Sequence, residues 1–179
     1  MPVEIVPYTN EWPRRFQQLA DGLRAALGET ALRIDHIGST SVPGLAAKPI
    51  VDLQISVADF EPLDAYRVPL EGLGYVFRAD NPELTKRYFR EGPGQPRTHI
   101  HVRQRGSWAE QFALLFRDYL RSHGDEADRY AEVKRSLALK CVTDRAAYTD
   151  AKEPYLWDLM RRADRWSQDV GWRLGPSDA

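Results

Sequence analysis

The pattern that decides the fold lies in the stretch Asp35-His36-Ile37-Gly38-Ser39-Thr40-Ser41-Val42-Pro43-Gly44-Leu45-Ala46-Ala47-Lys48-Pro49-Ile50-Val51-Asp52-Leu53-Gln54-Ile55. An apolar run ends at a Gly-Ser pair, a loop rich in Gly, Ser, Thr and Pro follows, and a second apolar run carries one acidic residue. Short runs of β-branched residues between turn formers predict strands over 31–37 and 49–57, the second largely buried. The stretch therefore predicts an anion-binding loop that leads into a strand with a carboxylate.

The segments on either side of this motif predict alternating helices and strands. Apolar residues at steps of three or four predict a helix that Asn10 caps and Gly28 ends. Glycines and prolines over 91–97 predict a loop between the last two strands. The other elements expected in the first two-thirds are a helix over 62–73 and strands over 75–78, 84–90 and 98–103.

The last third of the chain changes character after Ser107, where apolar residues follow a helical period. The patterns within 108–120 and 130–141 predict two helices. A third helix is predicted over 155–166, and Pro154 is expected to start it or kink it.

The composition fits one domain with a sizeable core. Apolar residues make up 42% of the 179, and no linker divides the chain, so we expect a single domain over 1–179. The expected fold class is α+β. A mixed sheet flanked by helices should occupy about 1–106, and a C-terminal helical bundle should occupy about 107–170.

The charge balance and the cysteine count limit the partners and the location. Lys and Arg total 25 against 26 acidic residues, so the net charge of -1 provides no global field for duplex nucleic acid. Cys141 is the single cysteine, and residues 1–4 lack the basic and apolar parts of a signal peptide, so we expect a cytoplasmic protein. No apolar run approaches the roughly 20 residues that span a bilayer, so no membrane partner is expected.

The Gly-Ser pair is the first candidate site. Backbone N–H groups at Gly38 and the hydroxyls of Ser39 and Thr40 can converge on one anion, because glycine lacks the Cβ that would block close approach. Lys48, at the far end of the loop, can return a positive charge to the same phosphate. A tight turn with no ligand is the alternative that a Gly-Ser pair alone permits.

Asp52 interrupts an apolar strand, where a carboxylate is costly unless it is paired, hydrogen-bonded or bound to a metal. On an extended strand it shares its face with Ile50 and Gln54. We therefore identify Asp52 as a candidate metal ligand and, with Lys48, as a candidate catalytic residue. A structural ion pair between Asp52 and Lys48 or an arginine is the alternative.

A second cluster of candidate residues lies in the strand over 98–103. His99, His101 and Arg103 alternate along it and should point to one face. Two imidazoles at this spacing can bind a metal or contact a phosphate, and His36 is a candidate third metal ligand. Arg103 is a candidate phosphate ligand. For each histidine the alternative is a hydrogen-bonded structural role.

Basic residues on the preceding strand admit two interpretations. Lys86, Arg87 and Arg90 surround aromatic residues, and we assign Arg87 as a candidate phosphate ligand. A solvated hairpin edge is the alternative.

Two tyrosine–lysine pairs in the last third lie four residues apart, so each pair shares a helix face from which a lysine could reach the cleft. Surface packing is the more common reason for this spacing. The pairs are Tyr130 with Lys134 and Tyr148 with Lys152.

From the helix around Trp12 to the segment near Trp166, the sequence resembles the GrpB family, a branch of the nucleotidyltransferase superfamily. The resemblance implies a polymerase-beta-like nucleotidyltransferase core with an appended helical bundle. The most specific motifs are His36-Ile37-Gly38-Ser39-Thr40-Ser41-Val42-Pro43-Gly44-Leu45, Lys48-Pro49-Ile50-Val51-Asp52-Leu53 and His99-Ile100-His101-Val102.

The resemblance also implies a metal site. In the superfamily a Gly-Ser pair holds nucleotide phosphates, and an Asp-x-Asp pair with a third carboxylate binds a divalent metal. Gly38, Ser39 and Asp52 match those positions, whereas Gln54 stands at the second acidic position, and its neutral amide cannot offset the charge of a triphosphate. The implied metal is Mg or Mn. If His101 substitutes for the missing carboxylate, the preference shifts toward Zn, Mn or Ni.

Three functions are open on these grounds. The first is nucleotidyl transfer from a nucleoside triphosphate, with Asp52 as metal ligand and Lys48 as charge neutraliser. The second is a non-catalytic module that binds a small-molecule nucleotide or phosphate ester, which Gln54 favours. The third is an accessory role linked to dephospho-coenzyme A kinase, because GrpB-like domains occur fused to that enzyme. The chain has no P-loop motif and is not itself that kinase.

Overall fold

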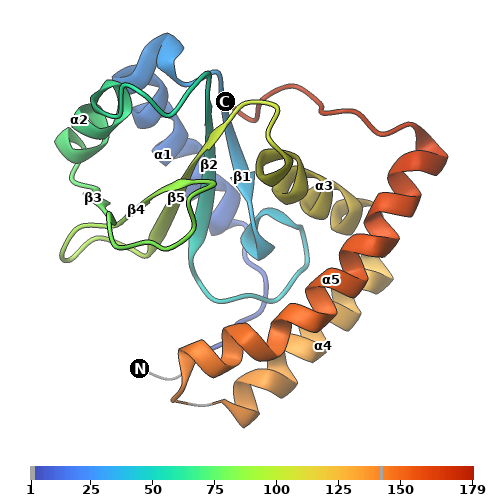
Figure 1. Ribbon diagram of the computed structural model, residues 1–179. Coiled ribbons are helices and arrows are strands. Elements are labelled where there is room, and N and C mark those ends of the chain that lie inside the picture. The colour runs from blue at the N-terminus through green and yellow to red at the C-terminus, as the bar shows by residue number, and fades with distance from the viewer. Residues whose placement is uncertain (1–2, 142) are drawn as a thin grey trace.

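The structure, a computed structural model, describes residues 3–141 and 143–179. Its strands form one mixed sheet in the order β1-β2-β5-β4-β3 (Figure 1). The central pair, β2 and β5, is parallel, and the other neighbours are antiparallel. The strands are β1 (Arg33–Ile37), β2 (Val51–Val57), β3 (Val76–Phe77), β4 (Arg87–Arg90) and β5 (Thr98–Gln104).

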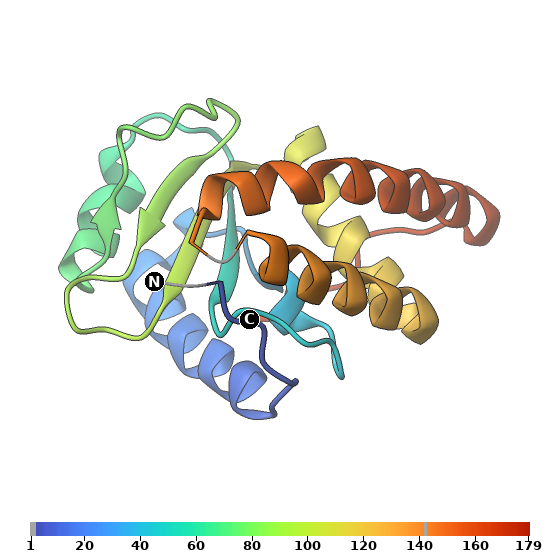
Figure 2. The ribbon, with the colours of Figure 1, turned by 90° about the horizontal axis from the view of Figure 1, so that it is seen from below.

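Helices lie on both sides of the sheet. α1 and α2 pack together on one side, and α3 lies on the other side, against β1 and β5 (Figure 1). α3, α4 and α5 pack on one another as a bundle, and α4 and α5 lie side by side in both views (Figure 2). The helices are α1 (Glu11–Leu27), α2 (Asp64–Gly72), α3 (Trp108–Ser122), α4 (Gly124–Lys140) and α5 (Arg145–Val170), with short 3-10 turns at Gly28–Thr30 and Ser39–Ser41.

Alternation along β5 divides its side chains between a core and a cleft. Ile100 and Val102 are fully buried against the α1 and α2 side. His99, His101 and Arg103 point to the opposite face and stay partly exposed, as the spacing predicted. The sheet therefore presents polar residues on the face that looks toward the helical bundle.

A second core joins the loop after β1 to the bundle. Val42 and Leu45 from the loop are almost completely buried among side chains of α3, α4 and α5, such as Leu120 and Leu159. This packing holds the Gly-Ser loop between the sheet and the bundle.

The segment after α5 returns along β1, the edge strand of the sheet. Ala179 N donates to the carbonyl of Ile34, and Asp178 accepts from His36 N at 2.9 Å and from Arg117 at 2.8 Å. These contacts pair backbone groups that an edge strand otherwise leaves exposed.

The start of α1 differs from the prediction. Asn10 has helical φ and ψ of -66° and -7° and makes no side-chain cap, so its predicted capping role is wrong. Thr9 Oγ1 accepts from Glu11 N instead, at 3.3 Å, one position before the residue that the pattern favoured. Gly28 does follow the last residue of the helix, with φ of +51°.

α5 is much longer than predicted. It begins at Arg145 because Asp144 caps it, accepting a hydrogen bond from Ala147 N at 2.9 Å. Pro154 lies inside the helix rather than at its start, where it removes one backbone donor. Packing of Tyr148 and Leu159, both buried, favours the continuous helix.

β3 and β4 are shorter than the predicted strands. β4 begins at Arg87 because Glu83 binds Thr85 and Lys86, which folds the preceding residues into a turn. Within the described ranges, no helix is long and apolar enough to cross a membrane.

Candidate functional site

The pairing of β2 with β5 brings a carboxylate and two imidazoles together. Asp52 is the register partner of His99, and Gln54 is the partner of His101. Asp52 Oδ1 lies 3.1 Å from His99 Nδ1 and 3.5 Å from His101 Nε2. One ligand atom from each of Asp52, His99 and His101 lies within 4.8 Å of the others, which is close enough for one metal ion.

The protonation states in this cluster suit a cation. Burial alone would raise the pKa of Asp52, but the contacts with His101 and His99 outweigh it and hold the pKa well below the usual range. Burial lowers the pKa of His101 against the opposing effect of Asp52. The carboxylate is therefore ionised and the His101 ring is neutral near pH 7, as metal ligands must be.

Gly38 approaches this cluster so closely that no side chain fits there. Its φ is +71°, and a Cβ atom at this position would lie 2.7 Å from Asp52 Oδ2. The next three residues, Ser39–Ser41, form a single 3-10 turn. The Gly-Ser pair thus lies directly beside the carboxylate, as the sequence predicted.

The hydroxyls of the turn differ in what they contact. Thr40 is buried, donates to the carbonyl of Ile50 at 3.1 Å and lies 3.0 Å from His36 Nε2, so its hydroxyl is used inside the protein. Ser39 lines the cleft and contacts the Tyr130 hydroxyl. Both residues border the hollow, but the Thr40 hydroxyl is held by two protein groups, so Ser39 is the better placed of the two to meet a ligand.

Helices α4 and α5 supply the opposite wall of a hollow of about 380 Å³ above Asp52. Lys48 Nζ lies 3.9 Å from the centre of the Tyr148 ring, and Lys152 Nζ lies 5.6 Å from the same centre. Lys134 is buried, donates to the carbonyl of Ala46 and also lines the hollow. Burial and the nearby charge of Lys152 lower the pKa of Lys134 to about 7.

The helix lysines illustrate what the sequence left undecided. The four-residue spacing allowed Lys134 and Lys152 to be either surface residues or cleft residues, and surface packing was the more common reason for it. The structure places both at the cleft, together with Lys48. The burial of Tyr130 and Tyr148, which the sequence does not show directly, decides this.

His36 does not join the three clustered ligands, contrary to the prediction. Its ring stacks on Phe16 with centroids 4.8 Å apart and contacts Thr40. Burial lowers the pKa of His36 to about 3, so the ring is neutral and structural. The ring packs between Phe16 and Thr40 and holds the Gly-Ser loop from its buried side.

The two predicted phosphate-binding arginines lie elsewhere. Arg87 pairs in register with Val102, which sends it to the opposite face of the sheet, over the Phe60 ring at 4.3 Å. Arg103 points to the cleft face, but its Nη1 lies 2.6 Å from a Glu83 carboxylate oxygen. The prediction is therefore wrong in placing Arg87 at the cleft, and Arg103 already has an acidic partner.

Gln54 is covered and does not face the cleft. Its Nε2 donates to the backbone carbonyl of Glu110 at 3.3 Å, under the first turn of α3. Ser107 caps this helix, and the Glu110 carboxylate accepts from Gly106 N at 2.6 Å and from Ser56 Oγ. Gln54 does point to the Asp52 side of the sheet, but the cap of α3 occupies that space.

Comparisons with known proteins identify close relatives. A family model described as GrpB protein matches residues 2–162. UPF0157 protein PA4798 from Pseudomonas aeruginosa is 41% identical over 165 residues, which cover 90% of this chain and 67% of that protein. A dephospho-CoA kinase from Mycolicibacterium paratuberculosis is 36% identical over 198 residues, covering 96% of this chain and 48% of the kinase. The chain thus spans about half the length of that relative.

Solved structures share the fold. The crystal structure of GrpB from Enterococcus faecalis has a TM-score of 0.83 and 32% identity, covering 91% of this chain and 99% of that one. A cytoplasmic RNA terminal U-transferase has a TM-score of 0.52 at 16% identity, covering 72% and 41%. The Cid1 poly(U) polymerase with bound MgGTP has the same TM-score at 13% identity, covering 73% and 42%. The predicted nucleotidyltransferase-like α+β fold is confirmed.

Proposed function

The chain belongs to the GrpB family, and from this premise we propose that it binds a nucleoside triphosphate with a divalent cation and transfers the nucleotidyl group. One observation carries the proposal. The ligand atoms of Asp52, His99 and His101 converge at the floor of a hollow whose far wall carries lysines. A cation on one side and ammonium groups on the other would hold a chain of phosphates between them.

The donor set fits a divalent transition metal. Asp52 would offer one oxygen, and His99 and His101 would each offer one nitrogen. Imidazole donors suit Zn and Mn better than Mg, which prefers oxygen ligands. When bound, such an ion supplies Lewis-acid polarisation of a phosphoryl oxygen.

The remaining groups would position the phosphates. The Ser39 hydroxyl borders the cleft beside Gly38, whose missing side chain leaves room for close approach. Lys48 and Lys152 would neutralise the outer phosphate oxygens. Their positive charge favours the triphosphate over an uncharged ligand.

The transfer step breaks a phosphoanhydride bond and forms a phosphoester bond. An acceptor hydroxyl oxygen forms a bond to the α-phosphorus, and the bond from that phosphorus to the oxygen bridging to the β-phosphate breaks. Pyrophosphate leaves with the electron pair, and the hydroxyl proton passes to water. Asp52, with its lowered pKa, holds a negative charge and orients the cluster throughout.

A binding module without transfer is the second candidate. It is favoured by Gln54, because the amide is buried under α3 and Asp52 is the single carboxylate lining the hollow among the described residues. Two-metal phosphoryl transfer uses several carboxylates to hold both ions. A protein with this site could retain a phosphate ester and one cation without catalysing exchange.

An accessory role in coenzyme A metabolism is the third candidate. Several relatives named dephospho-CoA kinase match nearly all of this chain through about half of their own length. The GrpB-like half of those proteins would then assist the kinase half.

Calorimetric titration with the four nucleoside triphosphates, with Mn²⁺, Zn²⁺ or Mg²⁺ present, tests the first two candidates when combined with a pyrophosphate release assay. Wild type is compared with Asp52→Ala and with Asp21→Ala, an exposed aspartate on α1. Transfer predicts metal-dependent pyrophosphate release that Asp52→Ala abolishes and Asp21→Ala retains. Binding without release supports the module, and absence of binding with every cation contradicts both.

A further inference from the structure

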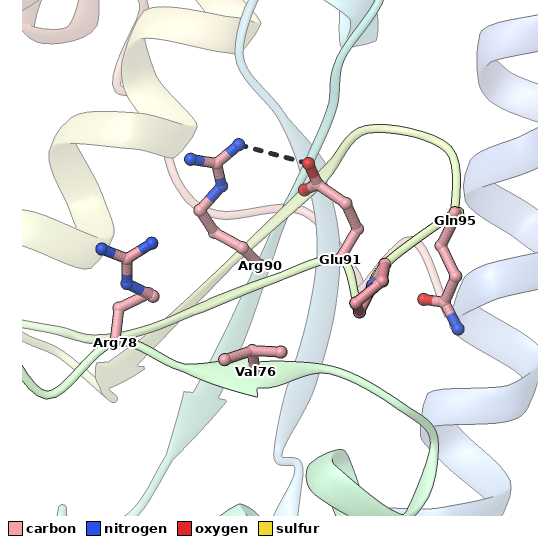
Figure 3. Close-up of a pocket in the computed structure, with 8 residues that line it drawn as sticks. Val76, Arg78, Arg90, Glu91 and Gln95 are labelled. Atoms are coloured by element: carbon pink, nitrogen blue, oxygen red, sulfur yellow. Dashed lines mark hydrogen bonds and ion pairs between the residues drawn. The ribbon is translucent and has the colours of Figure 1, made fainter.

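The polar face of the sheet continues beyond the candidate metal ligands onto β4 and β3. His99 pairs in register with Arg90 on β4, and Arg90 pairs with Val76 on β3. Register partners point to the same face of a sheet, so Arg90 lies beside His99. A hollow of about 440 Å³ lies here, bordered by Arg78, Arg90 and the turn over 91–95. Figure 3 shows both guanidinium groups on the same side of the strands.

One carboxylate at the border of this hollow, that of Glu91, pairs with two arginines, Arg90 at the hollow and Arg97 beside it. Glu91 Oε1 lies 3.2 Å from Arg90 Nη2 and 2.9 Å from Arg97 Nε, and Glu91 Oε2 accepts from Thr98 N. Arg78, by contrast, has its own partner in Asp80 at 2.8 Å. Two guanidinium groups therefore share one negative charge, which leaves one positive charge over.

Arg97 links this surplus charge to the metal ligands. Its Nη2 lies 3.5 Å from His99 Nε2, on the side of the ring away from Asp52. Its Nε faces Glu91 Oε1, so the guanidinium is held between the Glu91 carboxylate and the His99 ring. A guanidinium has five N–H donors, so those that Glu91 does not use can donate to an oxyanion.

We propose that Arg90 and Arg97 form the subsite for the second substrate, an acceptor that carries an oxyanion group. The inference rests on the proposed transfer function, in which the triphosphate occupies the lysine-lined hollow on the other side of His99. Guanidinium groups bind phosphate or carboxylate oxygens with paired hydrogen bonds. An acceptor held there by its phosphate or carboxylate would extend its hydroxyl past His99 toward Asp52.

The subsite holds the acceptor at a different place from the triphosphate. Lys48, Lys134 and Lys152 lie across the cleft from the sheet, whereas Arg90 and Arg97 lie along it, next to His99. A nucleotide can thus bind without occupying the arginines. The arginine pair would hold the acceptor, and the lysines would hold the nucleotide donor.

Three probes with the same three-carbon skeleton test the subsite: glycerol 3-phosphate, glycerate and glycerol. Calorimetry should show that wild type binds one or both anions and does not bind glycerol. Arg90→Gln and Arg97→Gln should each weaken anion binding about tenfold or more, because each removes a charge-assisted contact. Arg97→Lys keeps the positive charge but lacks the paired N–H donors of a guanidinium, so its anion affinity should lie between those of wild type and Arg97→Gln.

Nucleoside triphosphate binding, measured on the same proteins, separates this inference from the proposed function. We expect it to change little in Arg90→Gln and Arg97→Gln, and Arg14→Gln, an exposed arginine on α1, should leave both affinities unchanged. Equal anion affinity in wild type and both Gln variants, or no anion binding by a wild type that binds triphosphate, overturns the subsite alone. If wild type binds no nucleoside triphosphate, the proposed function is contradicted. Thermal unfolding midpoints identify any variant that fails to fold. If Arg97→Gln fails to fold, Arg97→Lys takes its place in the comparison with wild type.

Discussion

The side-chain amide of Gln54 donates a hydrogen bond to the backbone carbonyl of Glu110, with Nε2 3.3 Å from the oxygen. Both residues are fully buried, and Glu110 also fixes Ser56 and Gly106. This bond joins the centre of the sheet to the first turn of α3. Position 54 therefore serves the attachment of the helix, although the family resemblance places it at the second metal carboxylate.

Replacing Gln54 by Glu should destabilise the protein without creating a second metal site. A carboxylate there would face the Glu110 carbonyl, and the present Oε1 has no donor among the described residues. We expect the free energy of unfolding in urea to fall by roughly 2–4 kcal/mol at pH 7. Gln18→Glu, on the exposed face of α1, should change it by less than about 0.5 kcal/mol. A stable Gln54→Glu variant that binds a second Mn²⁺ would show that this position opens to the cleft.

Gly38→Ala should weaken metal binding more than its backbone strain explains. The new Cβ would lie 2.7 Å from Asp52 Oδ2 and push the carboxylate out of the cluster. Gly44→Ala is a matched control, because Gly44 also has positive φ, +79°, but an added Cβ meets no atom within 4 Å. Both variants should lose stability on the order of 1 kcal/mol or more from strain. Zn²⁺ and Mn²⁺ titrations should show reduced affinity in Gly38→Ala only, and equal loss in the two variants would contradict the role of the close approach.

Local sequence patterns identified most of the residues that the structure brings together around Asp52. The Gly-Ser pair, the lone acid in an apolar strand and the alternating histidines singled out Gly38, Asp52, His99 and His101, and strand periodicity fixed the face that each strand residue occupies. What it could not show was how neighbouring elements cover that face. Gln54 shares the face with Asp52, yet the cap of α3 buries it.

The errors have the same physical origin, since they depend on pairing and packing between distant segments. Arg87 lies on the face of the sheet away from the cleft, contrary to the prediction, because the β4 register sets it opposite Val102. His36 precedes the Gly-Ser pair in sequence, but its ring turns toward Phe16 in the core. The two helix lysines reach the cleft only through the docking of α4 and α5, which no local spacing determines.

His36 should make stability depend on pH. Burial lowers its pKa in the folded state to about 3, below the ordinary value near 6.5. Between these values the unfolded chain binds the proton and the folded protein does not, so stability is lost as pH falls. We expect the unfolding free energy to decrease by up to about 1.4 kcal/mol per pH unit from 6.5 toward 3 on account of this group.

Urea unfolding of His36→Phe across this pH range checks the assignment. In this variant the unfolding free energy should fall less steeply with decreasing pH, by up to about 1.4 kcal/mol per pH unit. His123→Gln, which removes an imidazole at the α3–α4 junction, should retain the pH dependence of wild type. Parallel slopes in wild type and His36→Phe would contradict the expectation.

Lys134 should make triphosphate affinity depend on pH. Burial and the charge of Lys152 lower its pKa to about 7, so the side chain is charged below that pH and increasingly neutral above it. Because only the charged form attracts phosphate, affinity should fall as pH rises from 6 to 8.5. Lys134→Met keeps the length of the side chain but carries no charge, so it should bind roughly tenfold or more weakly at pH 6 and lose this part of the pH dependence.

Lys140→Met is the matched control for this measurement. Lys140 lies exposed at the end of the same helix, so its removal leaves the cleft and the titration of the nucleotide itself unchanged. The difference between the two variants, measured by calorimetry at each pH, isolates Lys134. If both variants bind triphosphate like wild type from pH 6 to 8.5, Lys134 only donates to the Ala46 carbonyl and does not contact the ligand. A difference that is large at pH 6 and disappears by pH 8.5 places the Lys134 ammonium against the bound phosphates.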